Sequence, residues 1–510
     1  IYVDKTGLIS CTNERINTEE KYICVSRPRR FGKSMALKML AAYYSCGCNS
    51  RELFAGWKIE RDPNFEGHLN QYNVIFLNMQ QFLIGAKNCE VTEYLEQEVL
   101  EELLEEYGSY IKRPDIGLAD ALRRIYAKTG KKFILLFDEW DCVMRERQES
   151  EELQKRYLDF LRNLLKDQPY VALAYMTGIL PVKKYGQHSA LNMFWEYSMT
   201  DQNAFEEYTG FTEEEVKELC ERYGMDFAQT SGWYDGYRFR LFRHIYNPRS
   251  VVAAMSCGYF SNFWTSTETY EALKIYMDMD FDGLRSDIVR MLGGEHVRIN
   301  TLSFQNDMHT FKTKDDVLTL LIHLGYLAYD AESKEAFIPN KEIIGEFENA
   351  MSVGGWSEIM RILKSSEKLL EDTLRCDAKS VAEGLDKAHA EVASILTYND
   401  ENSLGCAIGL AYYSARKDYK IIRELPAGCG FADIVFLPLP SAGKPALVIE
   451  LKYDKTADTA LQQIKDRRYA QALEGYCGEI LLVGVNYDKD NRNKPHNCVI
   501  EKLVYGIDHK

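Results

Sequence analysis

The 510-residue chain has no apolar run of about 18 residues, so we expect no helix that spans a membrane. Basic residues are also in short supply: 62 Lys and Arg face 77 Asp and Glu, for a formal net charge of −15. This balance argues against a surface covered with phosphate-binding side chains. Residues 387–510 are close to neutral, so the acidic excess lies in the rest of the chain and any nucleic-acid surface is local.

Closely spaced cysteines are almost absent. Thirteen cysteines are scattered along the chain, and Cys46 and Cys48 are the only two that lie near each other. Without two matched pairs we expect no zinc site, and the odd number favours free thiols in a reduced, cytoplasmic protein. The first residues lack the basic and apolar regions of a secretory signal, and since no initiator Met is present we expect a short N-terminal piece to precede them.

The length exceeds what one hydrophobic core supports, and the composition is that of an ordinary globular protein. Three parts are expected: residues 1–211, 212–386 and 387–510. In the first part, apolar runs at 21–25, 73–78, 131–137 and 170–176 alternate with helical patterns. This alternation predicts an α/β domain with a parallel sheet covered by helices on both faces.

The middle part, 212–386, is predicted to be mainly helical, and Thr212 with Glu215 forms a capping-box signal for its first helix. A helix at 315–324, two short strands up to residue 338 and another helix from 340 give a winged-helix-like order. Such units bind DNA or serve as packing modules. Because no basic recognition helix is present, we favour packing.

The last part, 387–510, is predicted to be a second α/β unit. A helix over about 401–415 precedes strands at 431–436 and 446–452, which are joined by a Pro/Ser/Gly turn typical of a hairpin. A helix over about 459–473 and a strand at 479–485 complete it.

A basic segment with a glycine lies between the first strand and the first long helix. Its sequence, from Arg27, is Arg-Pro-Arg-Arg-Phe-Gly-Lys-Ser, which includes Arg29, Arg30, Phe31, Gly32, Lys33 and Ser34. Backbone amides and a helix N-terminus converge on an anion at such a junction, so Lys33 is expected to reach the β- and γ-phosphates and Ser34 to ligate Mg²⁺. Arg27 stands where a glycine is usual, and with Arg29 and Arg30 it is expected to add positive charge.

Acidic residues follow the strand at 131–137. There Asp138 is expected to hold the Mg²⁺ water shell and Glu139 to polarise the attacking water. Thr177, at the end of the next strand, is placed to orient that water or to sense the γ-phosphate. Taken alone, the basic segment could be no more than the start of a helix. Asp138 and Glu139, taken alone, could be no more than a capped loop after a strand. Together, at strand ends and in this order, they predict a nucleotide site.

The C-terminal hairpin carries a second group of charges. Asp433 lies in one strand, and Glu450 and Lys452 lie on one face of its partner because side chains alternate along a strand. Two carboxylates with a lysine predict a Mg²⁺ or Mn²⁺ site at which Lys452 positions or deprotonates a water. Glu401 would add a third carboxylate, and Gln463 and Tyr469 would orient substrate or Lys452. An exposed Glu-x-Lys is usually a solvated strand face, but Glu450 ends an apolar run, where a charge is costly.

These motifs resemble those of the bacterial AAA-ATPase-like proteins. The resemblance includes Tyr2-Val-Asp-Lys-Thr6, the Arg-Pro-Arg-Arg-Phe-Gly-Lys-Ser loop, Phe137-Asp-Glu139, Thr177-Gly178, Trp233-Tyr-Asp-Gly-Tyr-Arg-Phe239 and Tyr246-Asn-Pro248. The block from Gly430-Phe-Ala-Asp433 to Tyr469 resembles the PD-(D/E)XK nuclease domain, a restriction-endonuclease-like fold, which these proteins usually carry.

The resemblance implies ATP binding by Lys33, Ser34, Asp138 and Glu139, and metal-dependent DNA cleavage by Asp433, Glu450 and Lys452. It also implies a γ-phosphate sensor at Arg238, for which the alternative is an arginine packed among aromatic rings. The expected function is an ATPase that regulates a nuclease. Two alternatives stay open: a signalling ATPase whose nuclease-fold domain only binds a partner, and a DNA-binding module built on the winged-helix-like part. DNA versus RNA and a homo-oligomeric state also stay open.

Overall fold

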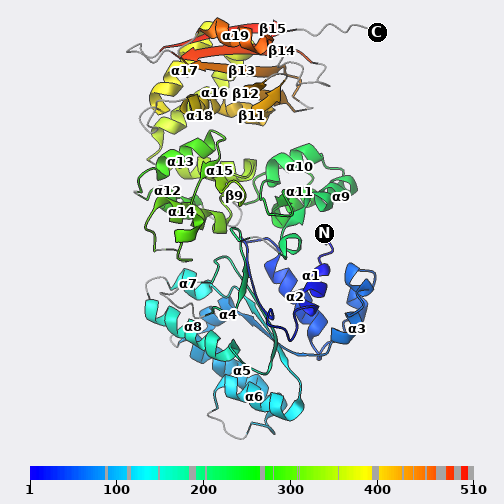
Figure 1. Cartoon of the computed structure of the whole chain (residues 1–510). Helices are drawn as coiled ribbons and strands as arrows, with labels where there is room; N and C mark the ends of the chain where they lie inside the picture. The colour runs from blue at the N-terminus through cyan, green and yellow to red at the C-terminus, as the bar shows by residue number, and fades with distance from the viewer. Residues whose placement is uncertain are drawn as a thin grey trace. The chain divides into compact units, whose positions relative to one another are not determined.

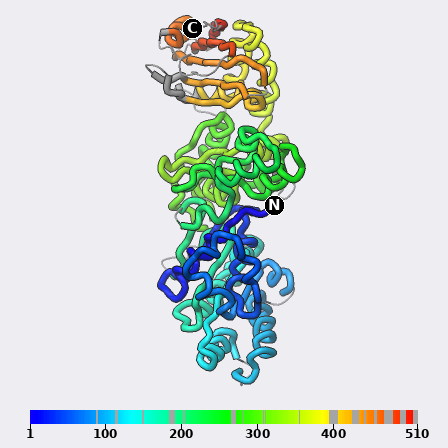
Figure 2. The backbone as a smooth tube through the Cα atoms, turned by 90° about the vertical axis from the view of Figure 1, so that its right-hand side faces the viewer, coloured from blue at the N-terminus to red at the C-terminus, as the bar shows by residue number. Residues whose placement is uncertain are grey.

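The computed structural model divides into two compact units, Ile1–Tyr276 with Arg298–Glu346, and Met277–Val297 with Phe347–Lys510 (Figures 1 and 2). Each unit is described by itself. The described residues are all of 1–510 except 87–89, 112–115, 148–149, 183–190, 202–203, 265–269, 280, 307, 309, 354, 393–400, 428–429, 440–441, 454–455, 467–477, 488–494 and 504–510.

The first unit is built on a five-stranded parallel sheet. The strands are β1 (Tyr22–Ser26), β2 (Asn73–Asn78), β3 (Phe133–Asp138), β4 (Val171–Gly178) and β5 (Trp195–Tyr197). Their order is β2-β3-β4-β1-β5, so β4 separates β1 from β3, and the carboxyl ends of these three strands meet at one edge of the sheet. The parallel sheet and its first four strands confirm the sequence prediction, whereas β5 was not predicted.

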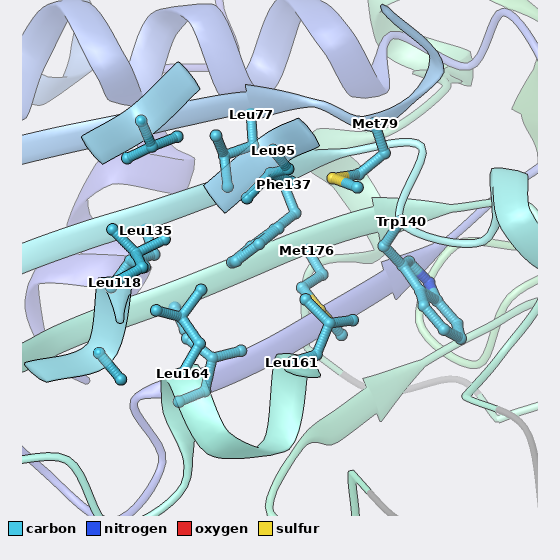
Figure 3. Packing of buried hydrophobic residues seen from close by; sticks show 14 of the residues in the cluster. Leu77, Met79, Leu95, Leu118, Leu135, Phe137, Trp140, Leu161, Leu164 and Met176 are labelled. Carbon is cyan, nitrogen blue, oxygen red and sulfur yellow. The ribbon is translucent and has the colours of Figure 1, made fainter. Parts of the chain in front are cut away.

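Helices cover both faces of this sheet. Along β1, Tyr22 and Cys24 pack into one core and Ile23 and Val25 into the other, as the two-residue period of a strand requires. The first core is closed by α5 (Val91–Tyr107), α6 (Leu118–Thr129) and α8 (Glu151–Leu165), and the second by α1 (Gly7–Asn13) and α2 (Lys33–Tyr44). Figure 3 shows the first core, where Leu161 and Leu164 of α8 lie beside Leu135, Phe137 and Met176 of the sheet.

Shorter elements complete the first unit. The predicted capping box is present at the start of α9 (Glu213–Tyr223), where Thr212 and Glu215 exchange hydrogen bonds. Helices α10 (Phe227–Tyr234) and α11 (Pro248–Cys257) follow. The predicted helix–hairpin–helix order is also confirmed, by α14 (Lys314–Leu324), the antiparallel strands β9 (Ala328–Asp330) and β10 (Glu335–Phe337), and the start of α15 (Lys341–Ser352).

The second unit holds a five-stranded mixed sheet. Its order is β11-β12-β13-β14-β15, and the β13–β14 pair alone is parallel among these strands. The strands are β11 (Tyr419–Ala427), β12 (Gly430–Pro438), β13 (Ala446–Tyr453), β14 (Ile480–Tyr487) and β15 (His496–Leu503). The predicted β12–β13 hairpin and β14 are confirmed, and β11 and β15 are additional strands. The helices include α16 (Ser357–Leu374), α17 (Ala378–Val392), α18 (Glu401–Ala411) and α19 (Ala457–Asp466).

The core of this second sheet lies against α19. Val435, Ala446 and Val448 of the hairpin pack with Leu461 and Ile464 of that helix. None of the helices in the described ranges combines the length and the apolar character needed to cross a membrane.

Candidate nucleotide site and candidate nuclease site

The loop between β1 and α2 is closed by its own lysine. Lys33 Nζ donates hydrogen bonds to the carbonyl oxygens of Arg27, at 2.9 Å, and Pro28, at 2.8 Å. Gly32 precedes α2 at φ +88°, a conformation that disfavours residues with a Cβ, and no side chain caps the helix. The first backbone amides of α2 therefore have no side-chain cap, as an anion-binding helix N-terminus requires.

Arg27, the first residue of the loop, is anchored inside the fold. Its guanidinium is fully buried and donates to Thr209 Oγ1 at 3.1 Å and to the carbonyl oxygens of Ser26 and Tyr197 at 3.0 and 2.9 Å. It also lies over the ring of Phe239, 4.5 Å from its centroid. Arg27 therefore ties the loop to β5 and its neighbours, and its guanidinium has no exposed surface with which to contact a phosphate.

The acidic residues lie at the edge where β3 and β4 end. Thr177 Oγ1 donates to Asp138 Oδ1 at 2.8 Å, and both side chains are buried. Glu139 follows with φ +54°, a strained conformation for a residue with a Cβ, and the next amide, Trp140 N, donates to the carbonyl oxygen of Thr177 at 3.0 Å. The structure thus brings Asp138, Glu139 and Thr177 together, as the sequence predicted.

Two further charged residues belong to this edge and were not predicted. Arg145 donates to Glu139 at 2.9 Å and to Asp141 at 3.2 Å, and Asp141 is fully buried. Their signal in the sequence is weak: Asp141 lies two residues after Glu139, and Arg145 follows one helical turn further on.

Burial controls the charge of Lys33. It lowers the pKa of that amine to about 8, because the charged form loses solvation. The carboxylates of Asp141, Glu139 and Asp138 oppose this effect. The negative charge of an incoming polyphosphate would favour the protonated amine, as the charge of these carboxylates does.

A cavity of about 1070 Å³ lies over the loop. Its charged part is lined by Arg29, Arg30, Lys33, Ser34 and Glu139, together with Phe31 and Gly32. Its apolar part is lined by side chains that include Tyr2, Met35, Met39, Leu53 and Trp57. A volume of this size, charged at one part and apolar at another, suits a nucleotide.

The N-terminal Tyr-Val-Asp-Lys-Thr segment forms part of the wall. Asp4 accepts from the amides of Thr6 and Lys58, both at 2.9 Å, and Lys5 pairs with Glu215 at 2.6 Å. These bonds hold the segment in place, and Tyr2 packs edge-on against Trp57 with ring centroids 4.9 Å apart.

Arg238 does not line this cavity. It pairs with Asp330 at 3.4 Å and lies over the ring of Phe337, 4.4 Å from its centroid. These are the contacts of the packed arginine that we gave as the alternative, and its sensor role stays a prediction.

The second site lies on the β12–β13 hairpin. Lys452 Nζ donates to Glu450 Oε1 at 2.8 Å, and Gln463 of α19 donates to the same oxygen. Asp433 Oδ2 accepts from the amide of Leu451 at 2.7 Å. The hairpin and α19 thus bring Asp433, Glu450, Lys452 and Gln463 together, whereas the side chain of Glu401 and all of Tyr469 lie outside the described residues.

Glu450 is fully buried, and this burial raises its pKa to about 7, with the charge of Asp433 as the next cause. Its second oxygen, Oε2, is buried and has no hydrogen-bond partner in the described part of the chain. A carboxylate with an unpaired buried oxygen next to another carboxylate fits a divalent cation, which would complete its coordination with water and substrate phosphate. No group of three or more His, Cys, Asp or Glu side chains is arranged as a metal site among the described residues. Asp433 and Glu450 are the two carboxylates that the hairpin brings close together.

Comparison with known proteins finds family matches at both ends of the chain. Residues 1–187 match the family described as "Predicted AAA-ATPase", and residues 401–497 match the PD-(D/E)XK nuclease superfamily. The chain therefore contains an AAA-ATPase-like domain and, further along, a domain of the PD-(D/E)XK nuclease superfamily, which confirms the resemblance and the fold class predicted from the sequence.

One curated relative is an uncharacterized protein encoded in the vnfD 5' region of Azotobacter chroococcum mcd 1. It is 25% identical over 285 residues, which are 52% of this chain and 51% of the relative, so the match spans about half of each protein. Among solved structures, a Walker-type ATPase of Pyrococcus abyssi matches 68% of this chain and 94% of its own, with 12% identity and a TM-score of 0.36. The ORC2 protein of Aeropyrum pernix matches 68% and 92%, with 10% identity and a TM-score of 0.30.

Proposed function

We propose that the chain hydrolyses ATP with Mg²⁺ at the cavity of the first unit and cuts DNA with Mg²⁺ or Mn²⁺ at the β12–β13 hairpin. One observation carries the proposal: the loop lysine, the uncapped start of α2 and the Asp138–Glu139 pair all lie at one edge of the parallel sheet, beside a nucleotide-sized cavity. The functional parts we propose are the ATPase domain at 1–211, the helical part at 212–386 and the nuclease domain at 387–510.

In the ATPase domain, Lys33 and the amides of α2 bind the phosphates, and Arg29 and Arg30 add positive charge from the cavity wall. Ser34 and Asp138 would hold Mg²⁺, which neutralises phosphate charge when bound. Thr177 fixes the Asp138 carboxylate by its 2.8 Å hydrogen bond. Glu139 accepts the proton of the attacking water. The adenine ring of ATP lies against the apolar wall of the cavity, near Tyr2 and Trp57.

In the nuclease domain, Asp433 and Glu450 would hold the cation, which stabilises charge on the phosphodiester when bound. Lys452 positions or deprotonates the attacking water, and Gln463 orients Glu450 by a hydrogen bond to Oε1. Buried Glu450 would bind the cation in its ionised form, so acid, which protonates it, competes with metal.

Purified protein with ATP, Mg²⁺ and plasmid or single-stranded DNA tests both activities. Lys33→Ala should lower ATP turnover by at least about 100-fold, and Asp433→Asn should lower DNA cleavage by a similar factor. The matched controls are Lys128→Ala on α6 and Asp458→Asn on α19, because both residues are exposed and lie outside the two sites. Turnover retained by Lys33→Ala, or cleavage retained by Asp433→Asn, would contradict the corresponding half of the proposal.

A further inference from the structure

The carboxylate of Glu139 is held by a buried arginine. Arg145 Nη2 donates to Glu139 Oε2 at 2.9 Å, and the Arg145 side chain is 6% exposed, against 36% for Glu139. Glu139 lines the cavity, whereas Arg145 is not among its lining residues. Among the contacts given by the described residues, the Glu139 carboxylate is therefore what links Arg145 to the cavity.

Arg145 is itself anchored. Its Nε donates to Asp141 Oδ2 at 3.2 Å, and the same oxygen accepts from the amides of Ile179, at 3.0 Å, and Leu180, at 2.8 Å. These two amides directly follow β4, the strand that ends with Thr177 and Gly178. A continuous set of hydrogen bonds thus runs from the backbone after β4 through Asp141 and Arg145 to Glu139.

The backbone of Glu139 is fixed as well. Its φ of +54° is maintained between two backbone hydrogen bonds, from Trp140 N to the carbonyl oxygen of Thr177 and from Cys142 N to that of Glu139, both at 3.0 Å. Arg145 comes from α7 (Cys142–Glu146), which begins three residues after Glu139. Backbone and side chain of Glu139 are therefore both held before any substrate arrives, as an efficient general base requires.

We propose that Arg145 is a positioning residue for ATP hydrolysis, which holds one oxygen of Glu139 so that the other meets the attacking water, and that Asp141 holds Arg145 in place. This inference rests on the proposed ATPase activity. Since Arg145 touches Glu139 and does not line the cavity, its loss should slow turnover and leave ATP binding nearly unchanged.

Steady-state ATP hydrolysis by Arg145→Gln and Arg145→Lys tests the inference. For Arg145→Gln we expect kcat to fall about 10- to 100-fold while KM changes less than about threefold, the pattern of an outer-shell residue that orients a reacting group. Arg145→Lys keeps a positive donor and should recover part of kcat. Arg147→Gln, on the exposed residue just after α7, removes the same charge and should leave kcat unchanged.

A double-mutant cycle separates positioning from a structural effect. If Arg145 acts through Glu139, adding Arg145→Gln to Glu139→Gln should lower kcat no further. An equal loss in both backgrounds, or an unchanged kcat in Arg145→Gln, would overturn the inference, and so would a kcat of Arg145→Lys no higher than that of Arg145→Gln. If Arg145→Gln does not fold, the kcat of Arg145→Lys is measured with and without Glu139→Gln. An equal loss of kcat in both backgrounds would again overturn the inference. Absence of turnover in the unaltered chain would instead overturn the proposed function, and this inference with it.

Discussion

Gly178 lies where two loops of the nucleotide site pass close to each other. A Cβ at this position would lie 2.7 Å from Trp140 Nε1 and 2.9 Å from Asp141 Oδ1, both in the loop after β3. Its carbonyl oxygen accepts from Arg27 N at 3.0 Å, so it also fixes the start of the phosphate loop. Gly178 is not among the glycines with positive φ, so its backbone conformation does not require glycine. Glycine is required because the neighbouring side chains leave no space for a Cβ.

Gly178→Ala should therefore destabilise the first unit by about 1–3 kcal/mol, the usual cost of overpacking, and should lower ATP turnover because Asp141 and Trp140 must move. Gly67→Ala is the matched control, since no atom lies within 4 Å of a Cβ at that exposed helical position. Urea denaturation of the two variants measures the difference. Equal stability of Gly178→Ala and Gly67→Ala would show that the loops adjust without cost.

At the scale of elements, Glu342 joins three parts of the first unit. From the first turn of α15 it accepts hydrogen bonds from Ser250 of α11, at 2.8 Å, and from the amides of Phe263 and Trp264, at 2.7 and 2.9 Å. Its side chain is buried, and burial raises its pKa to about 7. Helix α11 also lines the cavity, through Pro248, Arg249 and Val252, so Glu342 supports a wall of the nucleotide site.

The raised pKa makes stability depend on pH with a definite sign. Between about pH 4.5, where the unfolded carboxyl loses its proton, and about pH 7, the folded state binds more protons, so the free energy of unfolding falls as pH rises. Glu342→Gln removes this titration and should gain up to about 3 kcal/mol relative to the unaltered chain between pH 4 and pH 8. Urea denaturation of both proteins at several pH values measures the gain. A difference that does not vary with pH would show that Glu342 does not titrate in this window.

The sequence predicts elements and sites to the extent that their signals are local. Strands β1 to β4 were predicted because each is a continuous apolar run, whereas β5 has three residues and β15 mixes polar with apolar side chains, so both depend on a neighbouring strand for their definition. In the same way, Lys33 and Asp138 belong to local motifs. Arg145 was not predicted because its role depends on Asp141, which is held by amides 38 and 39 residues further along the chain.

At the scale of the whole molecule, the described residues of the two candidate sites fall in different compact units. The phosphate loop and Asp138 lie in the first unit, and Asp433, Glu450 and Lys452 lie in the second. We propose that ATP binding regulates DNA cleavage. Regulation of this kind is a coupling free energy between two sites, and such coupling is reciprocal for binding.

Because the coupling is reciprocal, it can be measured from either ligand, as a change in ATP affinity or in DNA affinity. Asp433→Asn should bind DNA without cutting it, so ATP affinity can be measured on this variant with and without DNA, and DNA affinity with and without ATP. If ATP tightens DNA binding by some factor, typically about 5 to 150, DNA must tighten ATP binding by the same factor. Lys33→Ala in the same background, which should not bind ATP, should show no effect of ATP on DNA affinity. Should both factors equal one, ATP and DNA bind independently, which would contradict regulation of the nuclease through its affinity for DNA.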